Sequence, residues 1–491
     1  MISSLKIAKS SNDVAMIGLD FGSTTSSAMI ALASVGQNSI TGRMQFENFR
    51  VVYRCEPVFT PFDKTKIDIA SLDDYLNKWL KESGFGYENF FSGGAIVTGI
   101  AAKKSNARAI AGLVKQKIGK SIIATADDPS FESWLAFMGN SFLLSEAMPK
   151  ISFINIDIGG GTTNPALGIN GSVKSTGCSF IGARHFQFKP GTRQLTAVSD
   201  WGMDLLDYLA IKKDIKEKFE IAEINAIIDF YIKGLEALVN GESDFFSQKG
   251  LKRYNQVPFL IDQALNAHGK STPVITFSGG VGELVYQHSM GKSLPGTTYY
   301  GDLGIDIARA IVKSRILSCN IRDIVPENLG RATVYGLTLH STQISGTTVF
   351  LSDPDVLPLN DIPIVAGLSL TADSTEIKQA LNMVKKCRHG GCIKIESNLK
   401  SQTGSECLNN IKRIGTSLAL GIEDPDFGKD SPLILLVDMN VGKTLGNYVS
   451  RWKTIDANLV VIDEIPDRDG HFVNIGQIHN NVIPVSFYGV R

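Results

Sequence analysis

Several features that would assign this chain to a broad class are scarce or missing. Only six cysteines occur among 491 residues, too few for the disulfide framework of a secreted domain, so we expect reduced thiols. Apolar runs such as PLILLV and NLVVI have the length of a buried strand and fall far short of the roughly 18–20 residues of a transmembrane helix. The N-terminal segment lacks the continuous apolar core of a signal peptide. We therefore expect a cytoplasmic protein that does not span a membrane.

An excess of one charge is also missing. Lys plus Arg and Asp plus Glu both number 49, so the net charge is zero. No long basic stripe marks a surface for nucleic acid, and we expect no nucleic-acid partner. A hydrophobic content of 43% with 20% charged residues is ordinary for a globular protein, and the length predicts two or more domains.

Glycine, by contrast, is concentrated in short turns. The segment NIDIGGGTTNPAL, residues 155–167, leads an apolar strand into Asp157, three glycines and two threonines. Each glycine costs roughly 0.5–1 kcal/mol relative to alanine, which indicates a ligand that closely approaches the backbone. The backbone N–H groups of such a turn form an anion site, and Thr162 and Thr163 add hydroxyl donors. Because Asp157 would repel a bare phosphate, the pattern predicts Mg²⁺ between them. The alternative is a β-hairpin whose glycine turn is capped by the aspartate.

An internal repeat strengthens the interpretation as a phosphate site. IGLDFGSTTSSA, residues 17–28, aligns with INIDIGGGTTNPA, residues 154–166. Both have alternating apolar residues, an Asp at the end of the strand, and a turn of Gly, Ser and Thr before a returning apolar stretch. Asp20 and Asp157 lie 137 positions apart, which is the size of a domain. The repeat therefore predicts two related α/β domains, each beginning with a phosphate-facing hairpin.

A third glycine turn follows another apolar strand. VITFSGGVGEL, residues 274–284, places Gly279, Gly280 and Gly282 before an expected helix, and the N-terminus of a helix favours anions. Long helical patterns are expected at about 205–239 and 257–266, and the pattern changes to a third α/β unit from about residue 347. The expected domains are 1–150, 151–346 and 347–491.

The three turns together resemble a known nucleotide site. In the order DFGSTT, DIGGGTT and FSGGVGE, they are similar to the phosphate-1, phosphate-2 and adenosine motifs of the actin, heat-shock chaperone and sugar-kinase ATPase superfamily. FESWLAFMGNS, residues 131–141, and RATVYGLTLHS, residues 331–341, resemble its two linking helices. The resemblance implies duplicated α/β halves of the actin-like, ribonuclease H-like fold around a nucleotide cleft, followed by a C-terminal α/β region.

The segments between these motifs narrow the resemblance. FSGGAIVTGIAAKKSNARA, ATADDPSFESWLAFMGN and GRATVYGLTLHSTQISGTTV look like the reactivating factors of ethanolamine ammonia-lyase, over roughly residues 14–350. That resemblance implies ATP-dependent rescue of a coenzyme-B12 lyase whose cofactor has lost its adenosyl group. The implied cofactors are ATP and Mg²⁺, the implied partner is the lyase, and the cytoplasmic location includes association with a bacterial microcompartment. The oligomeric state stays open, with a homodimer among the candidates.

The resemblance also assigns roles to individual residues. Asp20 and Asp157 are expected to hold Mg²⁺, and Glu132 to orient the attacking water. Alternatively, Glu132 is only a first-turn glutamate favoured by the helix dipole. Phosphate contacts are expected from Gly22, Ser23, Thr24, Thr25, Gly159, Gly160, Gly161, Thr162 and Thr163, and contacts on the adenosine side from Gly279, Gly280 and Glu283.

Two other functions stay open. A small-molecule kinase of the same fold needs a base near a substrate hydroxyl, for which Asp127 and Asp128 are spare carboxylates. A filament protein of the actin type would assemble on adding nucleotide. The segments that resemble the reactivating factors have no reason to occur in a kinase, and they favour ATP-dependent rescue of the lyase.

Overall fold

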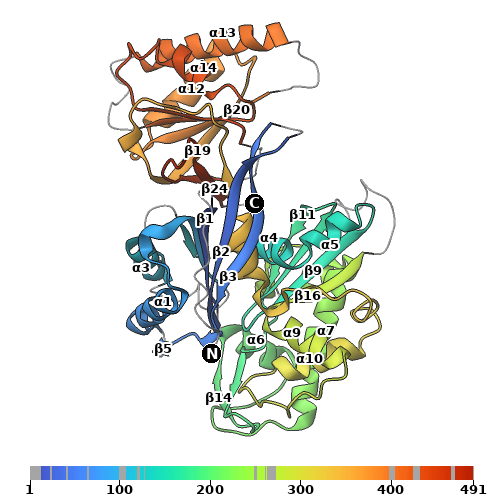
Figure 1. Cartoon of the computed structure of the whole chain (residues 1–491). Helices are drawn as coiled ribbons and strands as arrows, with labels where there is room; N and C mark the ends of the chain where they lie inside the picture. Colours follow the sequence, from blue (N-terminus) through green and yellow to red (C-terminus); the bar gives the residue numbers. More distant parts are fainter. Residues whose placement is uncertain are drawn as a thin grey trace.

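Three α/β bodies follow one another along the chain (Figure 1). The computed structural model describes residues 13–22, 25–39, 42–63, 66–98, 107–118, 122–126, 128–247, 252–259, 261, 273–397, 404–423, 432–465 and 470–489. Within these residues, no helix has both the length and the apolar character needed to cross a membrane.

The first body is a sheet in which a long antiparallel hairpin is joined by parallel strands. Its strand order is β3-β2-β1-β7-β8, with β4 paired to β2. The strands are β1 (Asp13–Phe21), β2 (Thr25–Gln37), β3 (Met44–Arg54), β4 (Val58–Phe59), β7 (Phe90–Val97) and β8 (Ile122–Ala126). Buried side chains of the helices α1 (Ile69–Ser83) and α3 (Ala107–Ile118) form one core with β1 and β7. The short strands β5 (Phe62–Asp63) and β6 (Lys66–Ile67) pair separately.

The second body repeats this plan. Its strand order is β15-β12-β10-β9-β16, with β11 paired to β10. In both sheets an antiparallel hairpin carries an aspartate near the end of its first strand, Asp20 opposite Ser27 and Asp157 opposite Asn164. In both, a strand from later in the chain lies parallel to that first strand. The strands are β9 (Ser152–Ile158), β10 (Thr163–Ile169), β11 (Ser172–Thr176), β12 (Cys178–Ser179), β15 (Asn255–Val257) and β16 (Val274–Ser278).

Two helices join the halves where glycines permit close packing. They are α4 (Pro129–Asn140) and α11 (Ala332–His340). A Cβ atom on Gly139 would lie 1.8 Å from the carbonyl oxygen of Ala332, and one on Gly336 would lie 2.0 Å from that of Leu135. Real Cβ atoms do not come this close, so the two helix backbones touch at this crossing. The linking helices expected at 131–141 and 331–341 are thus present and in contact.

Four helices of the second half enclose its large apolar core, which extends from Ile154 and Ile156 on β9 to Tyr231 and Ile307. They are α6 (Asp200–Tyr208), α7 (Ile221–Asn240), α9 (Gly279–Ser289) and α10 (Gly304–Lys313). A small hairpin of β13 (Phe186–Phe188) and β14 (Leu195–Val198) lies beside them. Helix α5 (Phe142–Ala147) packs against a separate cluster around Phe137 and Phe153. Among the described residues, 3₁₀ turns occur at Tyr87–Asn89, Ser243–Ser247, Lys252–Tyr254, Leu329–Arg331 and Pro354–Val356.

The single helix expected at about 205–239 is wrong. Helix α6 ends at Tyr208 and α7 begins at Ile221, and the loop between them contains left-handed residues at Ala210 (φ 55°) and Lys216 (φ 80°). Of the pattern at 257–266, Val257 ends β15, residues 258, 259 and 261 are not helical, and the rest lies outside the described residues.

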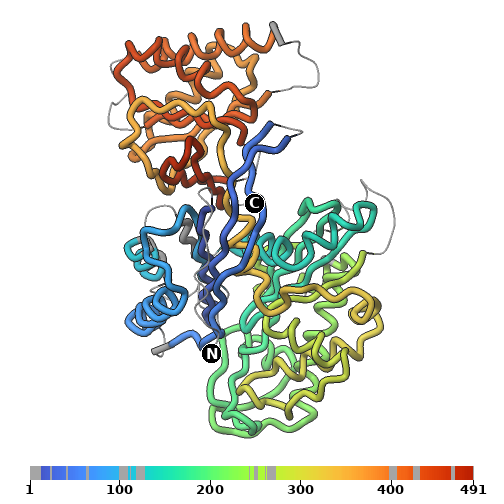
Figure 2. The backbone as a smooth tube through the Cα atoms, in the orientation of Figure 1, coloured from blue at the N-terminus to red at the C-terminus, as the bar shows by residue number. Residues whose placement is uncertain are grey.

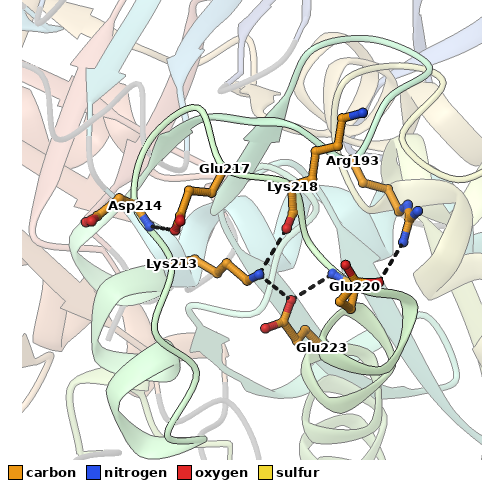
Figure 3. A network of polar contacts seen from close by, with 7 residues as sticks. All are labelled: Arg193, Lys213, Asp214, Glu217, Lys218, Glu220 and Glu223. Carbon is orange, nitrogen blue, oxygen red and sulfur yellow. Dashed lines mark hydrogen bonds and ion pairs between the residues drawn. The ribbon is translucent and has the colours of Figure 1, made fainter.

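Polar contacts fix the loop between α6 and α7 (Figure 3). The Lys213 ammonium donates to the Lys218 carbonyl (3.0 Å) and pairs with Glu223 (3.2 Å). Glu223 also accepts the backbone N–H of Glu220 (2.7 Å), which closes a capping box at the start of α7. Arg193 of the neighbouring hairpin loop lies 3.7 Å from Glu220. A new helix start therefore interrupts an apolar pattern that runs on through the sequence.

The third body is an eight-stranded mixed sheet with the order β17-β24-β23-β19-β20-β21-β22-β18. Its central strands β19 to β22 are parallel, and side chains of α12, α13 and α14 share their core. The strands are β17 (Thr342–Ile344), β18 (Phe350–Leu351), β19 (Leu359–Ser369), β20 (Gly391–Glu396), β21 (Leu433–Val437), β22 (Leu459–Ile462), β23 (Phe472–Ile475) and β24 (Pro484–Tyr488). The helices are α12 (Ser374–Lys385), α13 (Gly404–Ile422) and α14 (Gly442–Val449).

The β2–β3 hairpin extends from the first body to the third, as the backbone trace shows (Figure 2). Near its tip, Arg43 donates to the carbonyl oxygen of Asp438, which follows β21, at 3.0 Å. Strand β2 of this hairpin begins at Thr25, next to the first glycine turn. The hairpin therefore connects that turn to the C-terminal body.

Candidate functional site

A cavity of about 360 Å³ collects residues from both halves and from both linking helices. Of the residues expected at the site, it is lined by Asp20, Gly22, Thr25, Glu132, Asp157, Gly159, Gly160, Gly161, Thr162, Gly279, Gly280 and Glu283. Ser23 and Thr24 lie outside the described residues. Thr163 does not line the cavity, because it is fully buried and its hydroxyl donates to the carbonyl of Ile181 at 2.8 Å. Segments far apart in the sequence thus meet in one cavity.

The second glycine turn is held from behind by another segment of backbone. The hairpin pairs Thr163 with Ile158, which leaves residues 159–162 as the turn. The N–H groups of Ala183 and Arg184 donate to the carbonyls of Gly159 (3.1 Å) and Gly160 (2.6 Å). A Cβ atom on Gly182 would lie 2.6 Å from the Gly160 oxygen, so glycine is required there. The turn is therefore fixed before any ligand arrives.

The first glycine turn is held differently. The N–H of Gly22 donates to the carbonyl of Thr25 (2.9 Å), and the Thr60 hydroxyl donates to the carbonyl of Gly22 (2.6 Å). The Thr98 hydroxyl reaches Asp20 at 3.4 Å, near the limit for a hydrogen bond. The bond from Gly22 to Thr25 has its counterpart in the second turn, where the N–H of Gly159 donates to the carbonyl of Thr162 at 2.9 Å. The difference is that side-chain hydroxyls add to the support of the first turn.

Asp20 and Asp157 place two carboxyl groups at the wall of the cavity. Burial and the nearby Asp157 raise the pKa of Asp20 to about 7, against a small lowering by Thr98. Burial raises the pKa of Asp157 to about 6, and the hydrogen bond from Ser278 opposes this rise. The described residues that line the cavity include no Lys, Arg or His. Two carboxylates facing a cavity without positive charge fit a hard divalent cation such as Mg²⁺.

An ion in this cavity would have few protein ligands. Within the described part of the chain, no group of three or more His, Cys, Asp or Glu side chains is arranged to hold a metal. Mg²⁺ dehydrates reluctantly and is commonly held by one or two carboxylates, with water and phosphate oxygens as its other ligands. Asp20 and Asp157 fit that manner of binding.

The third glycine turn presents a helix N-terminus to the cavity. Ser278 occupies the N-cap position of α9, but its side chain does not cap the helix and donates to Asp157 Oδ1 at 2.6 Å. Gly279 has φ 77°, and a Cβ atom there would lie 2.5 Å from the carbonyl of Ile158. Gly279, Gly280 and Val281 line the cavity. A helix start that is not capped by its own side chain favours an anionic ligand.

Glu132 lies in the first turn of α4, is only 8% exposed and lines the cavity. The preceding Asp128 caps α4 by accepting the N–H of Phe131 at 3.0 Å, and it also accepts the N–H of Gly489 at 3.0 Å. Asp127 lies outside the described residues. Of the two described residues, Glu132 contributes to the cavity wall and Asp128 does not.

Sequence reasoning missed several residues of the cavity wall. The most polar is Asp302, which is 8% exposed and accepts the N–H of Gly304 at 2.9 Å. Burial raises the pKa of this carboxyl. Phe59, Thr98, Gln287, Tyr300 and Thr333 also line the cavity. Asp302 precedes the start of α10 in GDLGID, and this aspartate-glycine helix start was the one signal that could have pointed to it.

Two duplicated halves, each with a phosphate-type hairpin facing one cavity, define the actin-like ATPase fold. Within that class, the family model described as "Ethanolamine utilisation protein EutA" matches residues 12–488, and the chain belongs to this family.

The chain is similar over nearly its whole length to two curated relatives. It is 25% identical over 484 residues to the ethanolamine ammonia-lyase reactivase EutA of Escherichia coli (strain K12), and 25% identical over 490 residues to that of Salmonella typhimurium (strain LT2). In each comparison the match covers 96% of this chain and 97% of the relative. A crystal structure of an exopolyphosphatase-like protein aligns with a TM-score of 0.38 and 11% identity, over 67% of this chain and 97% of that one.

Proposed function

We propose that this chain is an ATPase that reactivates ethanolamine ammonia-lyase. In this proposal, ATP hydrolysis promotes release of damaged cobalamin from the lyase and its exchange for intact adenosylcobalamin. The observation that carries the proposal is the meeting of Asp20, Asp157 and three glycine turns in one cavity between the halves. The names of the two curated relatives supply the partner.

The proposal gives each part that phosphoryl transfer needs to a residue at the cavity. This reaction depends mainly on positioning and on offsetting negative charge. The glycine turns, with Thr25 and Thr162, bind phosphate oxygens, while Gly279, Gly280 and Glu283 line the adenosine side. Asp20 and Asp157 would hold Mg²⁺, which would supply the positive charge that phosphate oxygens require. Glu132, buried in the cavity wall, accepts a hydrogen bond from the attacking water and orients it.

Closure of the halves would transmit the state of the nucleotide to the lyase. The contact of α4 with α11 through Gly139 and Gly336 forms the joint, and rotation there changes the relative position of the two bodies. The surface that meets the lyase then differs between the nucleotide-bound and nucleotide-free states. Cytoplasmic location, with association with a microcompartment, belongs to the same proposal.

The kinase alternative requires a free base next to a substrate hydroxyl. Of the two carboxylates considered for it, Asp128 instead accepts hydrogen bonds at the cap of α4 and from Gly489, and Asp127 lies outside the described residues. Both curated relatives are named as reactivases.

The decisive experiment measures recovery of stalled lyase. Ethanolamine ammonia-lyase inactivated with hydroxocobalamin is mixed with this protein, ATP, Mg²⁺ and adenosylcobalamin, and ammonia release is followed. We expect recovery only when all three additions are present, and none with Asp157→Ala. Equal recovery without ATP would refute the proposal. Phosphate appearing on ethanolamine would replace it with the kinase function.

A further inference from the structure

A chain of buried hydrogen bonds leads from the linking helix α4 to Asp157. The side-chain amide of Asn140, at the end of α4, donates to Asn155 Oδ1 at 2.6 Å. The Asn155 amide donates to Ser278 Oγ at 3.0 Å, and Ser278 donates to Asp157 Oδ1 at 2.6 Å. These four side chains are between 0% and 7% exposed. The path crosses three elements, since Asn155 and Asp157 lie on β9 and Ser278 ends β16.

Each group in this path has its direction fixed by its neighbours. Asn155 Oδ1 also accepts the hydroxyl of Thr276 at 3.2 Å, so its amide N–H is the end that faces Ser278. If the Asn155 amide were turned over, its N–H₂ would meet the N–H₂ of Asn140, and two donors would face each other. Ser278 has a single hydroxyl hydrogen, and it donates that hydrogen in the bond to the Asp157 carboxylate. All three donors therefore point toward Asp157.

Such a path is stabilising only while it is complete. Hydrogen bonds in series polarise one another, and the bond to a charged carboxylate is the strongest of the three. Removing one partner leaves a buried donor or acceptor without a bond, which costs more than the bond itself contributes. The path therefore holds Asp157 in one side-chain rotation.

The position of Ser278 argues against a purely local role. Serine is among the preferred N-cap residues because its oxygen accepts an N–H of the first helical turn. Here the side chain makes no capping bond, and the hydroxyl is directed to a carboxylate 121 positions away in the chain.

We propose that Ser278 is a positioning residue for Asp157. Its hydrogen bond to Oδ1 fixes the orientation of the carboxylate that would hold Mg²⁺. Asn155 and Asn140 hold Ser278 in turn and connect this constraint to the joint between the halves. The inference rests on the proposed function, because it concerns the metal that ATP brings to the cavity.

The test is Ser278→Ala, followed by the Mg²⁺ dependence of thermal stabilisation by ATP. We expect the Mg²⁺ concentration at half of the maximal Tm shift to rise about tenfold, the effect of losing one hydrogen bond to a charged group. Ser278→Thr keeps the hydroxyl and should stay within about twofold of the wild type. ATP binding in EDTA should be unchanged in Ser278→Ala, because the serine acts through the metal.

The matched control is Ser314→Ala. Ser314 is also buried, and its hydroxyl also donates to a carboxylate, Glu236 Oε1, at 2.6 Å, but it does not line the cavity. This variant should lower the Tm without moving the Mg²⁺ midpoint. A Ser278→Ala protein with the wild-type midpoint overturns the inference while the proposed function stands. A wild type without any Mg²⁺-dependent shift overturns both.

A second variant covers the case in which Ser278→Ala does not fold. Asn140→Ala removes the far end of the path, and Asn140 does not line the cavity. The Mg²⁺ midpoint should move in the same direction as for Ser278→Ala, by about threefold. An unchanged midpoint in a folded Asn140→Ala protein contradicts the connection to α4.

Discussion

The two hairpins that face the cavity have the same sequence pattern and different support. In the second half, Asp157 accepts a 2.6 Å hydrogen bond from Ser278, and backbone N–H groups hold the glycine turn from behind. In the first half, Asp20 accepts a 3.4 Å bond from Thr98, and Thr60 holds the turn. The repeat thus preserved the aspartates and the turns, while the surroundings of each diverged.

This difference concerns how firmly each carboxyl is held. Burial raises the pKa of both groups, and the nearby Asp157 adds to the rise at Asp20. The hydrogen bond to Asp157 is 2.6 Å long, and the one to Asp20 is 3.4 Å long. Because a carboxylate with a fixed orientation binds a cation better, we expect the second half to be the main anchor for a metal.

The largest expected effect tests that assignment directly. Asp157→Ala should lower ATP turnover by about 10²–10³, the loss typical when one preorganised stabilising group is removed. Asp20→Ala should lower it by a smaller factor. Steady-state turnover at saturating Mg²⁺ measures both.

Glu242→Ala is the control for these variants. It removes an exposed carboxylate that accepts a hydrogen bond from Asn240 and does not line the cavity. Its turnover should match the wild type. Equal activity in Asp157→Ala and Glu242→Ala would remove the metal role, and equal losses for Asp157→Ala and Asp20→Ala would remove the asymmetry.

The next effect is the cost, in free energy of unfolding, of ionising the buried Asp20 carboxyl when no metal is present. The folded-state pKa of Asp20 is raised from 3.8 to about 7, so its contribution to stability is full at low pH and is lost as the pH rises toward 7. Asp20→Asn cannot ionise. In EDTA at pH 8 it should therefore be more stable than the wild type, by up to about 4 kcal/mol.

Chemical denaturation in EDTA at pH 5 and pH 8 measures this difference. The advantage of Asp20→Asn should be smaller at pH 5, where the wild-type carboxyl is protonated. The same advantage at both pH values would show that ionisation of Asp20 carries no cost.

A third effect concerns the joint between the halves. Gly139→Ala would place a Cβ atom 1.8 Å from the Ala332 oxygen, and overpacking of this kind typically costs about 1–3 kcal/mol. The matched control is Gly112→Ala in α3, where nothing lies within 4 Å of the added Cβ. That change should stabilise by up to about 1 kcal/mol through helix propensity.

Thermal unfolding separates the two alanine variants. Gly139→Ala should also reduce ATPase activity, since the joint positions both halves of the cavity. Similar Tm values for the two variants would show that the close contact of α4 and α11 is not required.

Much of this architecture follows from local pattern. The hairpins, the strand before Gly279 and the two related α/β domains were predicted from apolar alternation, turn residues and the repeat. The actin-like fold was implied by the resemblance of the three turns to a known superfamily, and that fold is confirmed. These features depend on neighbouring residues, which is why one sequence suffices for them.

The rest depends on contacts that have no local signature. The break between α6 and α7 was missed because the left-handed residues there are Ala210 and Lys216, where glycine would have marked a turn. Asp302 and Thr98 reach the cavity only through tertiary packing. The bond between Ser278 and Asp157 joins positions 121 apart, and the preference of serine for helix caps predicted a different partner.

The smallest expected effect concerns a residue that supports only the second turn. His185 is fully buried, its Nδ1 lies 2.7 Å from the Ser199 hydroxyl, and the backbone of Gly161 lies beside its ring. Burial lowers its pKa from 6.5 to about 4. Below pH 6.5, His185 therefore binds a proton in the unfolded chain but stays neutral in the folded protein. The contribution of neutral His185 to the free energy of unfolding is lost as the pH falls toward 4.

His185→Gln has no such titration, so the difference in unfolding free energy between wild type and variant should depend on pH. Between pH 7.5 and pH 5, the unfolding free energy of the wild type should fall by about 2 kcal/mol relative to that of the variant, because pH 5 lies roughly 1.5 units below the pKa of His in the unfolded chain. Protonation of Asp20 and Asp157 acts in the opposite direction over this range, but it is common to both proteins and cancels in the difference. Loss of packing in the variant changes the difference in unfolding free energy by the same amount at every pH, so it does not change how that difference depends on pH. Urea unfolding at four or five pH values gives that slope, and a constant difference would mean that His185 is not held neutral behind the second glycine turn.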